Sequence, residues 1–536
     1  MRESLVIALL ILICTQSSAQ VNARSVWVAD QGDGNYKNPV LHADYSDPDA
    51  IRVGDDFYMT ASSFTAVPGL PILHSKDLVN WNLIGYALDR LVPIDYFKQV
   101  RHGGGVWAPS IRHHNDEFII YYPDPDFGIY LTKAKKPEGP WSEPVLVEAG
   151  KGLIDPCPLW DDDGQAYLVH AYAGSRAGIK SILVLKKLSA DGTHTLDAGQ
   201  IIYDGHITDP TVEGPKLYKR NGYYYVFAPA GGVATGWQLV LRSKNIYGPY
   251  ERRVVMDQGS TSINGPHQGA WVTTPAGADW FLHFQDKEAY GRVVHLQPMQ
   301  WIKDWPVIGS DVDLDGKGEP VLQNKKPATG ATTTAMSPPE SDEFSSRPGM
   351  QWQWQANPEA TWVFHNASSG MLRLYARPLE GGTIWNAPNL LLQKLPAEEF
   401  TVTTRIMFHP NTKSTGDRAG LVIFGERFAS VSLVNTEKGV ELAYATGNDK
   451  TEEMQVIPGY QKGEVFLRVT VRKGATCTFA YSDDGKHFQS IQTDFTAAPG
   501  RWVGAKVGLF CVSKTGTNDS GYADVDWFRI TPPSRN

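Results

Sequence analysis

The stretch "ITDPTVEGPKLYKRNGYYYVFAP", residues 207–229, carries the pattern that decides the fold. Its second half is an aromatic β-strand that follows a tight turn at Asn221-Gly222, and a short apolar strand precedes that turn. At the head of the first strand a carboxylate, Glu213, stands directly before Gly-Pro. A charge in this position requires solvent, a partner or a chemical role.

The same pattern recurs at four other places in the chain. The copies are "DPDAIRVGDDFYMTAS" from Asp47, "WAPSIRHHNDEFIIYY" from Trp107, "DPCPLWDDDGQAYLVHA" from Asp155 and, more weakly, "HQGAWVTTPAGADWFLHF" from His267. Each copy begins with one residue, which we call the head residue, and continues with a short apolar strand, a turn and an aromatic strand. Successive copies lie about 50 to 60 residues apart. This period predicts an all-β fold, a five-bladed β-propeller in which each copy forms the inner hairpin of one blade.

The head residues fall at nearly the same distance before each turn: Asp47, Trp107, Asp155, Glu213 and His267. Because the innermost strands of a propeller line its central axis, these positions should converge at one end of the channel. Asp-Pro is also a common way to open a turn, and Asp49 and residues 161–163 are interpreted as turn carboxylates only.

Clustered carboxyl groups indicate a reaction type. Glycoside hydrolysis uses two of them, one protonated to donate to the leaving oxygen and one ionised to activate water or to attack directly. A third carboxylate nearby can hold the acid in its protonated form. Three acidic heads on different blades fit this division of labour.

Several motifs together resemble glycoside hydrolase family 43. They are "HADYSDPDAIRVGDDFYM", "GVWAPSIR", "LIDPCPLWDDDG", "VEGPKLYK" and "YGRVVHLQPMQW", and the resemblance covers roughly residues 38–305 before it continues into a C-terminal β-sandwich. Members of this family are five-bladed propellers, mainly β-xylosidases, α-L-arabinofuranosidases and arabinanases, and their mechanism is inverting. The resemblance implies that Asp47 is the general base, Glu213 the general acid, and Asp155 the residue that orients this acid and tunes its pKa.

The resemblance also implies four substrate-binding residues. Arg292 of "YGR" corresponds to an arginine that grips sugar hydroxyls, and His267 to an axial histidine that holds a water or a metal ion in relatives. Trp107 and Phe64 correspond to walls of the pocket. Each of these residues also has a purely structural interpretation. Arg292 would then be an ordinary strand-end arginine, His267 a hydrogen-bonded core histidine, and Trp107 and Phe64 core aromatics. After Phe64 the chain reads Thr-Ala-Val, so it lacks the large ring often found there in relatives, and the mouth of the pocket is undefined.

The second half of the chain predicts a separate domain. Residues 20–324 are expected to form the propeller and the Pro/Thr/Ala-rich residues 325–340 a linker, while residues 341–536 carry the short alternating segments of a jelly-roll β-sandwich. This part resembles the lectin-like domain of family 43 xylosidases, in which an early and a late aspartate, here Asp342 and Asp526, can hold a structural calcium ion. Edge-strand aspartates in water are the alternative. No cofactor is expected to be required.

The N-terminus predicts export. Arg2 precedes an apolar run at residues 5–14 and small residues at 17–19, which together indicate a signal peptide over residues 1–19 and a periplasmic or extracellular protein. The apolar run is too short to span a membrane. The remaining cysteines are odd in number, so a pair between Cys477 and Cys511 and buried free thiols are both open.

The expected partner is an oligosaccharide or polysaccharide. The chain has a formal net charge of -8 and no basic run, which disfavours nucleic acid. The sequence therefore predicts an exo-glycosidase that removes terminal β-D-xylose or α-L-arabinofuranose, without deciding between the two sugars. A fructan-active propeller hydrolase and a non-catalytic sugar-binding protein are the alternatives. The first lacks its Trp-x-Asn-Asp-Pro motif here, and the second has no need of a positioned acid.

Overall fold

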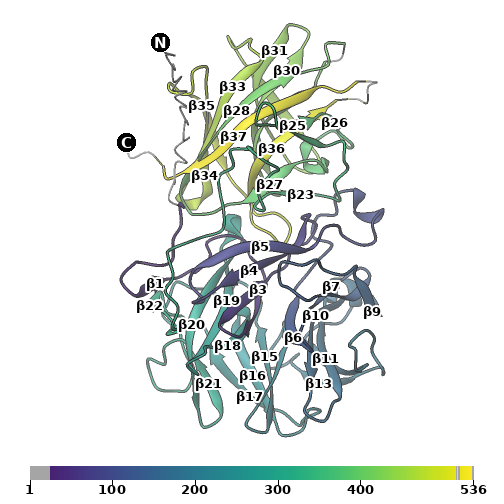
Figure 1. The fold of residues 1–536 in the computed structure, drawn as a ribbon, viewed down its shortest axis with the longest axis vertical. Helices are drawn as coiled ribbons and strands as arrows, with labels where there is room; N and C mark the ends of the chain where they lie inside the picture. The colour runs from purple at the N-terminus through teal and green to yellow at the C-terminus, as the bar shows by residue number, and fades with distance from the viewer. Residues whose placement is uncertain (1–24, 414, 515, 517–518, 534–536) are drawn as a thin grey trace, which may run out of the picture.

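The computed structural model describes residues 25–533 except 414, 515, 517 and 518. It contains a β-propeller formed by the first part of the chain and a β-sandwich stacked on one of its faces (Figure 1). The predicted signal peptide lies outside the described residues. Within the described part of the chain, no helix is long and apolar enough to cross a membrane.

The described residues contain five four-stranded antiparallel sheets, the blades, each with its strands in chain order. The first two blades are β2 (Asp49–Val53), β3 (Asp56–Thr60), β4 (Gly69–Ser75) and β5 (Trp81–Leu88), then β6 (Ser110–His114), β7 (Glu117–Asp124), β8 (Gly128–Ala134) and β9 (Val145–Ala149). The third is β10 (Leu153–Trp160), β11 (Ala166–Tyr172), β12 (Ile182–Leu188) and β13 (Gln200–Asp204). The last two are β14 (Lys216–Arg220), β15 (Tyr223–Ala230), β16 (Trp237–Ser243) and β17 (Glu251–Met256), then β18 (His267–Thr273), β19 (Asp279–Asp286), β20 (Arg292–Ile302) and β21 (Trp305–Ile308).

The five predicted turns each join the first two strands of a blade, which confirms the repeat. Asn115, Asp116 and Asn221 adopt positive φ angles of 50°, 59° and 50°. Such left-handed residues close tight hairpins without splaying the strands, and Asn and Asp tolerate them well. The first strand of each blade is the innermost: β2 contacts β6 and β18, and β10 contacts β6 and β14.

The N-terminal segment closes the ring onto the fifth blade. The short strand β1 (Asn35–Lys37) pairs with β22 (Gln323–Lys325), which follows that blade, and Leu41 bridges to Val294 of β20. The Asn38 side-chain amide donates to the backbone oxygen of Leu296 over 2.9 Å. The first and last parts of the propeller thus share one buried cluster.

A buried polar cluster on the axis joins the innermost strands. Asp49 accepts hydrogen bonds from the backbone N–H of Ile111 at 2.8 Å and from the Arg112 guanidinium at 2.7 Å. Arg112 also donates to the Cys157 sulfur at 2.8 Å, and the Lys216 ammonium lies 3.9 Å from the Asp49 carboxylate. We call Asp49, Arg112, Cys157 and Lys216 the axial cluster. Asp49 is therefore no turn carboxylate, because it is wholly buried and bonded across two blades.

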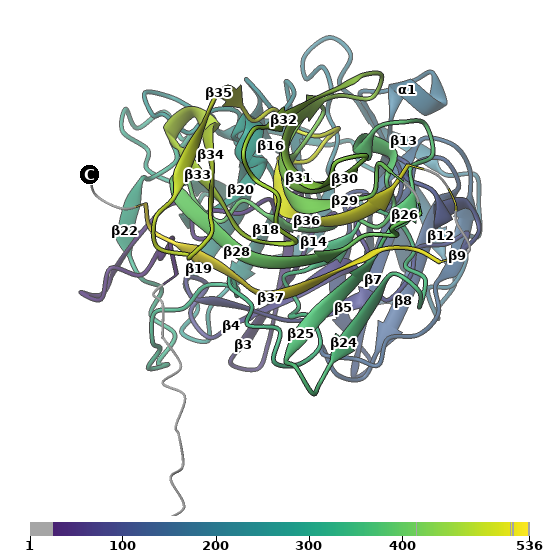
Figure 2. The same cartoon turned by 90° about the horizontal axis from the view of Figure 1, so that it is seen from above.

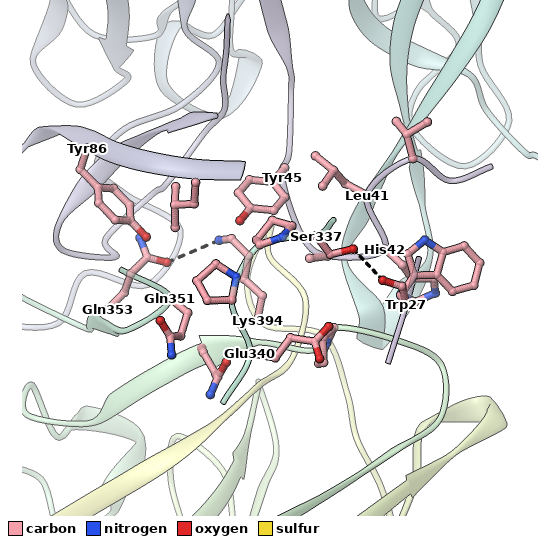
Figure 3. A pocket seen from close by; sticks show the side chains of 17 residues that line it. Trp27, Leu41, His42, Tyr45, Tyr86, Ser337, Glu340, Gln351, Gln353 and Lys394 are labelled. Carbon is pink, nitrogen blue, oxygen red and sulfur yellow. Dashed lines mark hydrogen bonds between the residues drawn. The ribbon is translucent and has the colours of Figure 1, made fainter. Parts of the chain in front are cut away.

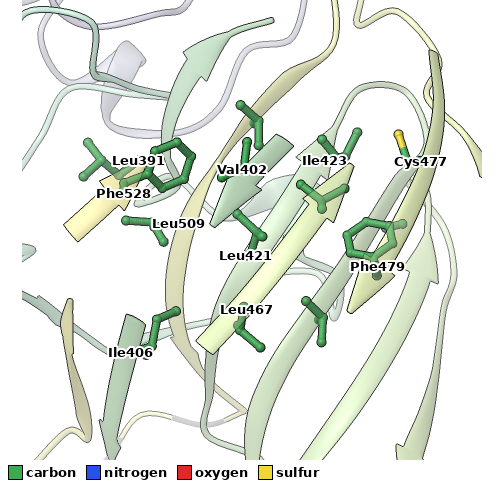
Figure 4. Packing of buried hydrophobic residues seen from close by; sticks show 14 of the residues in the cluster. Leu391, Val402, Ile406, Leu421, Ile423, Leu467, Cys477, Phe479, Leu509 and Phe528 are labelled. Carbon is green, nitrogen blue, oxygen red and sulfur yellow. The ribbon is translucent and has the colours of Figure 1, made fainter. Parts of the chain in front are cut away.

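The sandwich has two layers, seen from above in Figure 2, in which the strands are antiparallel apart from one short parallel pair between Arg377–Pro378 and residues 512–513. In the described residues one layer comprises β23 (Gln353–Trp354), β26 (Arg377–Pro378), β27 (Leu391–Lys394), β29 (Arg418–Phe424), β30 (Phe428–Thr436), β31 (Gly439–Gly447), β32 (Glu452–Ile457) and β36 (Lys506–Ser513). The other comprises β24 (Val363–Asn366), β25 (Met371–Tyr375), β28 (Phe400–His409), β33 (Glu464–Arg472), β34 (Thr476–Ser482), β35 (Gln489–Thr496) and β37 (Tyr522–Thr531). Alternate residues of the two layers interdigitate in one apolar core, with Leu421, Leu509 and Phe479 at its centre (Figure 4).

The helical content is small. The described residues include α1 (Gly174–Ala177) and four short 3-10 turns: η1 (Tyr96–Lys98), η2 (Glu288–Tyr290), η3 (Ile384–Asn386) and η4 (Lys473–Ala475). The described cysteines, Cys157, Cys477 and Cys511, are all buried and free, so the Cys477–Cys511 pair is not formed.

The predicted linker, residues 325–340, packs along the first blade. The Thr333 hydroxyl donates to Asp77 over 2.6 Å, and the Ser337 hydroxyl donates to the backbone oxygen of Trp27 over 2.7 Å (Figure 3). Its bonded side chains hold the segment in place, so it fixes how the two domains sit on each other.

The interface between the domains is partly polar. Backbone N–H groups of Val67 and Trp354 bond reciprocally to each other's carbonyl oxygens, which adds a sandwich residue to the propeller. Beside this contact lies a cavity of about 50 Å³, lined by both domains and the linker (Figure 3). Burial lowers the pKa of His42 in its wall to about 4 and raises the pKa of Glu340 to about 7.

We predict that Asp49→Asn destabilises the propeller by about 3–5 kcal/mol, because it leaves the Arg112 and Lys216 charges buried without their anion. Urea denaturation of the full chain, followed by tryptophan fluorescence, measures this change. Asp55→Asn, in the exposed first turn, is the matched control and should stay within about 0.5 kcal/mol of wild type. Equal stability of the two variants would contradict a stabilising role for the axial cluster.

Candidate active site

The head residues meet at one end of the axis, held there by irregular backbone. Asp47 and Asp155 have φ angles of 55° and 57°, in the left-handed region. The register of β10 shifts between Ile154 and Cys157, and that of β18 shifts next to His267. Such bulges redirect a side chain at the end of a strand, and strain of this kind is frequent at functional sites.

Asp47 is held by short polar contacts on both of its oxygens. The hydroxyls of Ser46 and Ser62 donate to Oδ2, and Arg292 Nη1 lies 3.1 Å from Oδ1. Arg292 also donates to Ser46 over 2.8 Å. The structure therefore brings the predicted base and the predicted sugar-gripping arginine into direct contact. The two serines come from the "YSDPD" and "ASSF" motifs, but their role was not predicted from the sequence.

Glu213 and Asp155 form a coupled acidic pair. Burial raises the pKa of Glu213, and the charges of Asp155 and Asp47 raise it further, against the opposing effect of Arg292. Burial likewise raises the pKa of Asp155, although the backbone N–H of Gly214 donates to its Oδ2 over 2.7 Å. Since two close carboxyl groups resist joint ionisation, this arrangement favours retention of a proton on the pair.

Gly214 is required at its position by shape. Its φ angle is 58°, and a Cβ there would lie 2.9 Å from the Gln268 side chain. The close approach lets its N–H reach Asp155 while Glu213, one residue earlier, stays at the pocket. This explains the Glu-Gly sequence at the head of the fourth blade.

His267 is buried on the axis with both ring nitrogens unpartnered among the described residues. Its Nε2 lies 3.6 Å from Glu213 Oε1, which is too long for a hydrogen bond. Burial, assisted by the Arg292 charge, lowers the pKa of His267 to about 3. The ring is therefore neutral at ordinary pH, and its free lone pair could accept a hydrogen bond from water or ligate a cation. The interpretation as a hydrogen-bonded core histidine does not hold for the described contacts.

The pocket walls come from both domains. The two predicted wall residues, Phe64 and Trp107, lie side by side, with their ring centroids 6.2 Å apart. Trp502, from a sandwich loop, lies edge-on to Trp107 at 6.1 Å and is 46% exposed. A cavity of about 400 Å³ beside it reaches Arg292. Trp502 thus supplies a large ring at the mouth, which the Thr-Ala-Val segment after Phe64 could not provide.

Asp44 fastens this sandwich loop to the catalytic end of the propeller. Its Oδ1 accepts the backbone N–H of Arg292 at 2.9 Å, and its Oδ2 accepts the backbone N–H of Gly504 at 2.9 Å. A Cβ at Gly504 would lie 2.7 Å from the backbone nitrogen of Gly291, so the two segments touch directly. One buried carboxylate therefore positions both Arg292 and the loop that carries Trp502.

The two aspartates of the predicted calcium site have partners within the sandwich. Asp342 accepts hydrogen bonds from the backbone N–H groups of Phe344 and Gly349, and Asp526 pairs with Arg405 at 2.9 Å. Calcium at these two residues stays a prediction. Within the described residues, acidic side chains also cluster at metal-binding distances in an exposed turn, at Asp311, Asp313 and Asp315.

The geometry defines a class of enzyme. A carboxylate hydrogen-bonded to serines, a second carboxyl whose raised pKa favours its protonated form, and a third beside it are the groups that glycoside hydrolysis needs. The aromatic walls provide flat faces for sugar C–H groups. The site is that of a glycoside hydrolase.

Comparison with known proteins identifies the family. The sequence profile of glycosyl hydrolases family 43 matches residues 36–306, and that of the beta xylosidase C-terminal concanavalin A-like domain matches residues 341–531. A beta-xylosidase of Formosa agariphila is 33% identical over 563 residues, which cover 96% of this chain and 93% of that protein. The chain belongs to glycosyl hydrolase family 43.

More distant relatives share both domains. A non-reducing end alpha-L-arabinofuranosidase of Bacteroides ovatus is 27% identical over 536 residues, covering 94% of this chain and 96% of that protein. The crystal structure of a xylan beta-1,4-xylosidase from Bacillus halodurans matches with a TM-score of 0.82 at 25% identity, covering 92% of this chain and 99% of that one.

We predict that Asp155→Asn moves the basic limb of the kcat/KM profile toward acid pH. Removing the Asp155 charge lowers the pKa of Glu213, so the acid loses its proton at lower pH and the rate near neutrality falls. Initial rates across the pH range measure the shift. Glu213→Gln should instead lose most activity on substrates whose leaving group needs a proton, and much less on substrates with very acidic leaving groups. An unchanged profile for Asp155→Asn would show that Asp155 has no influence on the acid.

We predict that Asp44→Ala acts partly through Trp502. The backbone N–H groups of Arg292 and Gly504 both lose their acceptor, so the loop is released and kcat/KM should fall about 10-fold or more, as for the loss of a positioning contact. In a double-mutant cycle with Trp502→Ala the two effects should be less than additive, because Asp44→Ala displaces the ring that Trp502→Ala removes, while the effect on Arg292 remains. Fully additive effects, with a normal melting temperature for each variant, would contradict this coupling.

Proposed function

We propose that this chain is an exported, inverting exo-glycosidase that removes terminal pentose, β-D-xylose or α-L-arabinofuranose, from plant cell-wall oligosaccharides. The observation that best supports this proposal is the acidic pair, in which Glu213 has a raised pKa next to Asp155. Asp47, in turn, is oriented by serine hydroxyls and Arg292. The names of the relatives, beta-xylosidase and alpha-L-arabinofuranosidase, support the choice of sugars. A pocket walled by Phe64, Trp107 and Trp502 suits a chain end.

The reaction follows from these positions. A water molecule transfers a proton to Asp47 while its oxygen attacks the anomeric carbon of the terminal pentose. The bond from that carbon to the leaving oxygen breaks, and Glu213 gives its proton to this oxygen. The products are free pentose with inverted configuration and the shortened chain. Arg292, beside Asp47, is placed to hold hydroxyls of the same sugar.

The proposal of export depends on the leader alone. Residues 1–19 have the charged, apolar and small-residue regions of a signal peptide. The free buried thiols in the described structure are compatible with an oxidising compartment, because burial protects them and raises the pKa of Cys477 to about 12.

We predict that the wild-type enzyme hydrolyses an aryl β-D-xyloside, an aryl α-L-arabinofuranoside or both, and that Asp47→Asn lowers kcat by about 100-fold or more while the protein stays folded. An amide cannot accept the proton of the attacking water. NMR of the first product should show inverted configuration, which requires the Asp47 and Glu213 carboxyls to lie roughly 6.5–9.5 Å apart. A first product of retained configuration would refute the mechanism, and undiminished hydrolysis by Asp47→Asn would refute the assignment of the base.

A further inference from the structure

A second cavity lies between the two domains, on the other side of the pocket walls. Its volume is about 620 Å³, within the range of roughly 300–1,000 Å³ that is usual for ligand sites. It is lined by arginines and aromatic rings: Arg101, Arg176, Arg427, Arg501, Tyr96 and Trp385. We call it the arginine groove. Both domains contribute to it, since Trp385, Arg427 and Arg501 come from the sandwich.

The groove adjoins the catalytic pocket through Trp107. The Trp107 indole N–H donates to the backbone oxygen of Gly103 over 3.0 Å. The aliphatic stem of Arg501 packs on this glycine, where a Cβ would lie only 2.8 Å from Arg501 Cγ. From the propeller side, the Arg176 guanidinium lies 5.6 Å from the Trp107 ring. A sugar chain that leaves the pocket past Trp107 and Trp502 therefore enters the groove.

Most of the groove arginines have no ion-pair partner among the described residues. Arg176 pairs with Asp126 at 3.2 Å. Arg101 instead donates to the Tyr96 carbonyl and the Gln99 amide, and Arg427 to the Thr496 carbonyl. Within the described residues, neither of them nor Arg501 has a carboxylate within ion-pair distance.

The two sides of Trp502 differ in charge. Three carboxylates line the arginine groove, Asp126, Glu426 and Asp449, and the arginines outnumber them. In the cavity that reaches Arg292, three carboxylates face Arg292 and Arg501, and Arg501 and Glu426 line both cavities. The arginines that line only the groove therefore favour a negatively charged chain on that side.

We propose that the arginine groove holds the leaving chain of the substrate and selects chains that carry a carboxylate, namely xylo-oligosaccharides branched with a hexuronic acid. Tyr96 and Trp385 are half-buried in the groove wall, and guanidinium groups that have no carboxylate partner match the geometry of a carboxylate. This proposal rests on the proposed function, because it concerns the leaving side of the same reaction. It gives the sandwich a direct part in choosing the substrate.

The test compares a xylo-oligosaccharide carrying a glucuronic acid branch with the same chain unbranched and with an aryl pentoside. Arg427→Ala, which lines the groove but not the cavity that reaches Arg292, should lower kcat/KM for the acidic chain about 10-fold relative to the neutral chain, the scale of one charge-assisted hydrogen bond. Hydrolysis of the aryl pentoside, which does not reach the groove, should stay within about 2-fold of wild type. Arg347→Ala, an exposed sandwich arginine outside the groove, is the matched control and should change no ratio.

A binding titration keeps the proposal independent of turnover. On the Asp47→Asn background, the acidic oligosaccharide should bind more tightly than the neutral one, and Arg427→Ala or Arg101→Ala should remove the difference. Raising the salt concentration toward 1 M should also weaken this preference, since it screens exposed charges. Equal binding of the two chains, or a preference that survives both substitutions, would overturn the proposal. Failure of aryl pentoside hydrolysis would refute the proposed function, and the titration would still decide the groove.

Discussion

The axial cluster is the contact on which the rest of the structure depends. Asp49, Arg112, Cys157 and Lys216 come from four different innermost strands, and each bonds across a blade boundary in the buried centre of the ring. Charges buried in this way are favourable only when every partner is present. The cluster therefore makes the position of each innermost strand dependent on the others. These strands in turn position the residues at the mouth of the channel.

The candidate catalytic residues lie next to this cluster along the chain. Asp47 lies two residues before Asp49, and Asp155 lies two residues before Cys157. Asp47 precedes strand β2, and the register of β10 shifts between Ile154 and Cys157, so regular strand alternation does not set the direction of either side chain. Left-handed backbone at Asp47 and Asp155 directs these side chains instead, and the packed strands on either side hold this strained backbone in place.

The two domains form one active site. Asp44, close to the catalytic base in sequence, accepts N–H groups both from Arg292 and from Gly504 of the sandwich, which places Trp502 at the pocket mouth. The linker is bonded along the first blade instead of hanging free. The sandwich thus contributes Trp502 to the mouth of the pocket, while the propeller supplies the clustered carboxyl groups.

The sequence by itself determined the repeat, the five turns and the head residues, because strand alternation and turn chemistry are local properties that a single chain displays openly. It also indicated that carboxylates gather at one end of the channel, since they occupy equivalent places in the repeat, while the roles of acid and base come from the family resemblance and stay predictions. It misassigned Asp49 as a turn residue, because the partners of a carboxylate depend on which segments fold against it. Only the tertiary structure decided that Asp44 and Gly504, 460 residues apart, are hydrogen-bonded. Contacts between domains leave no period in the sequence, because they arise from the docking of two surfaces that fold separately.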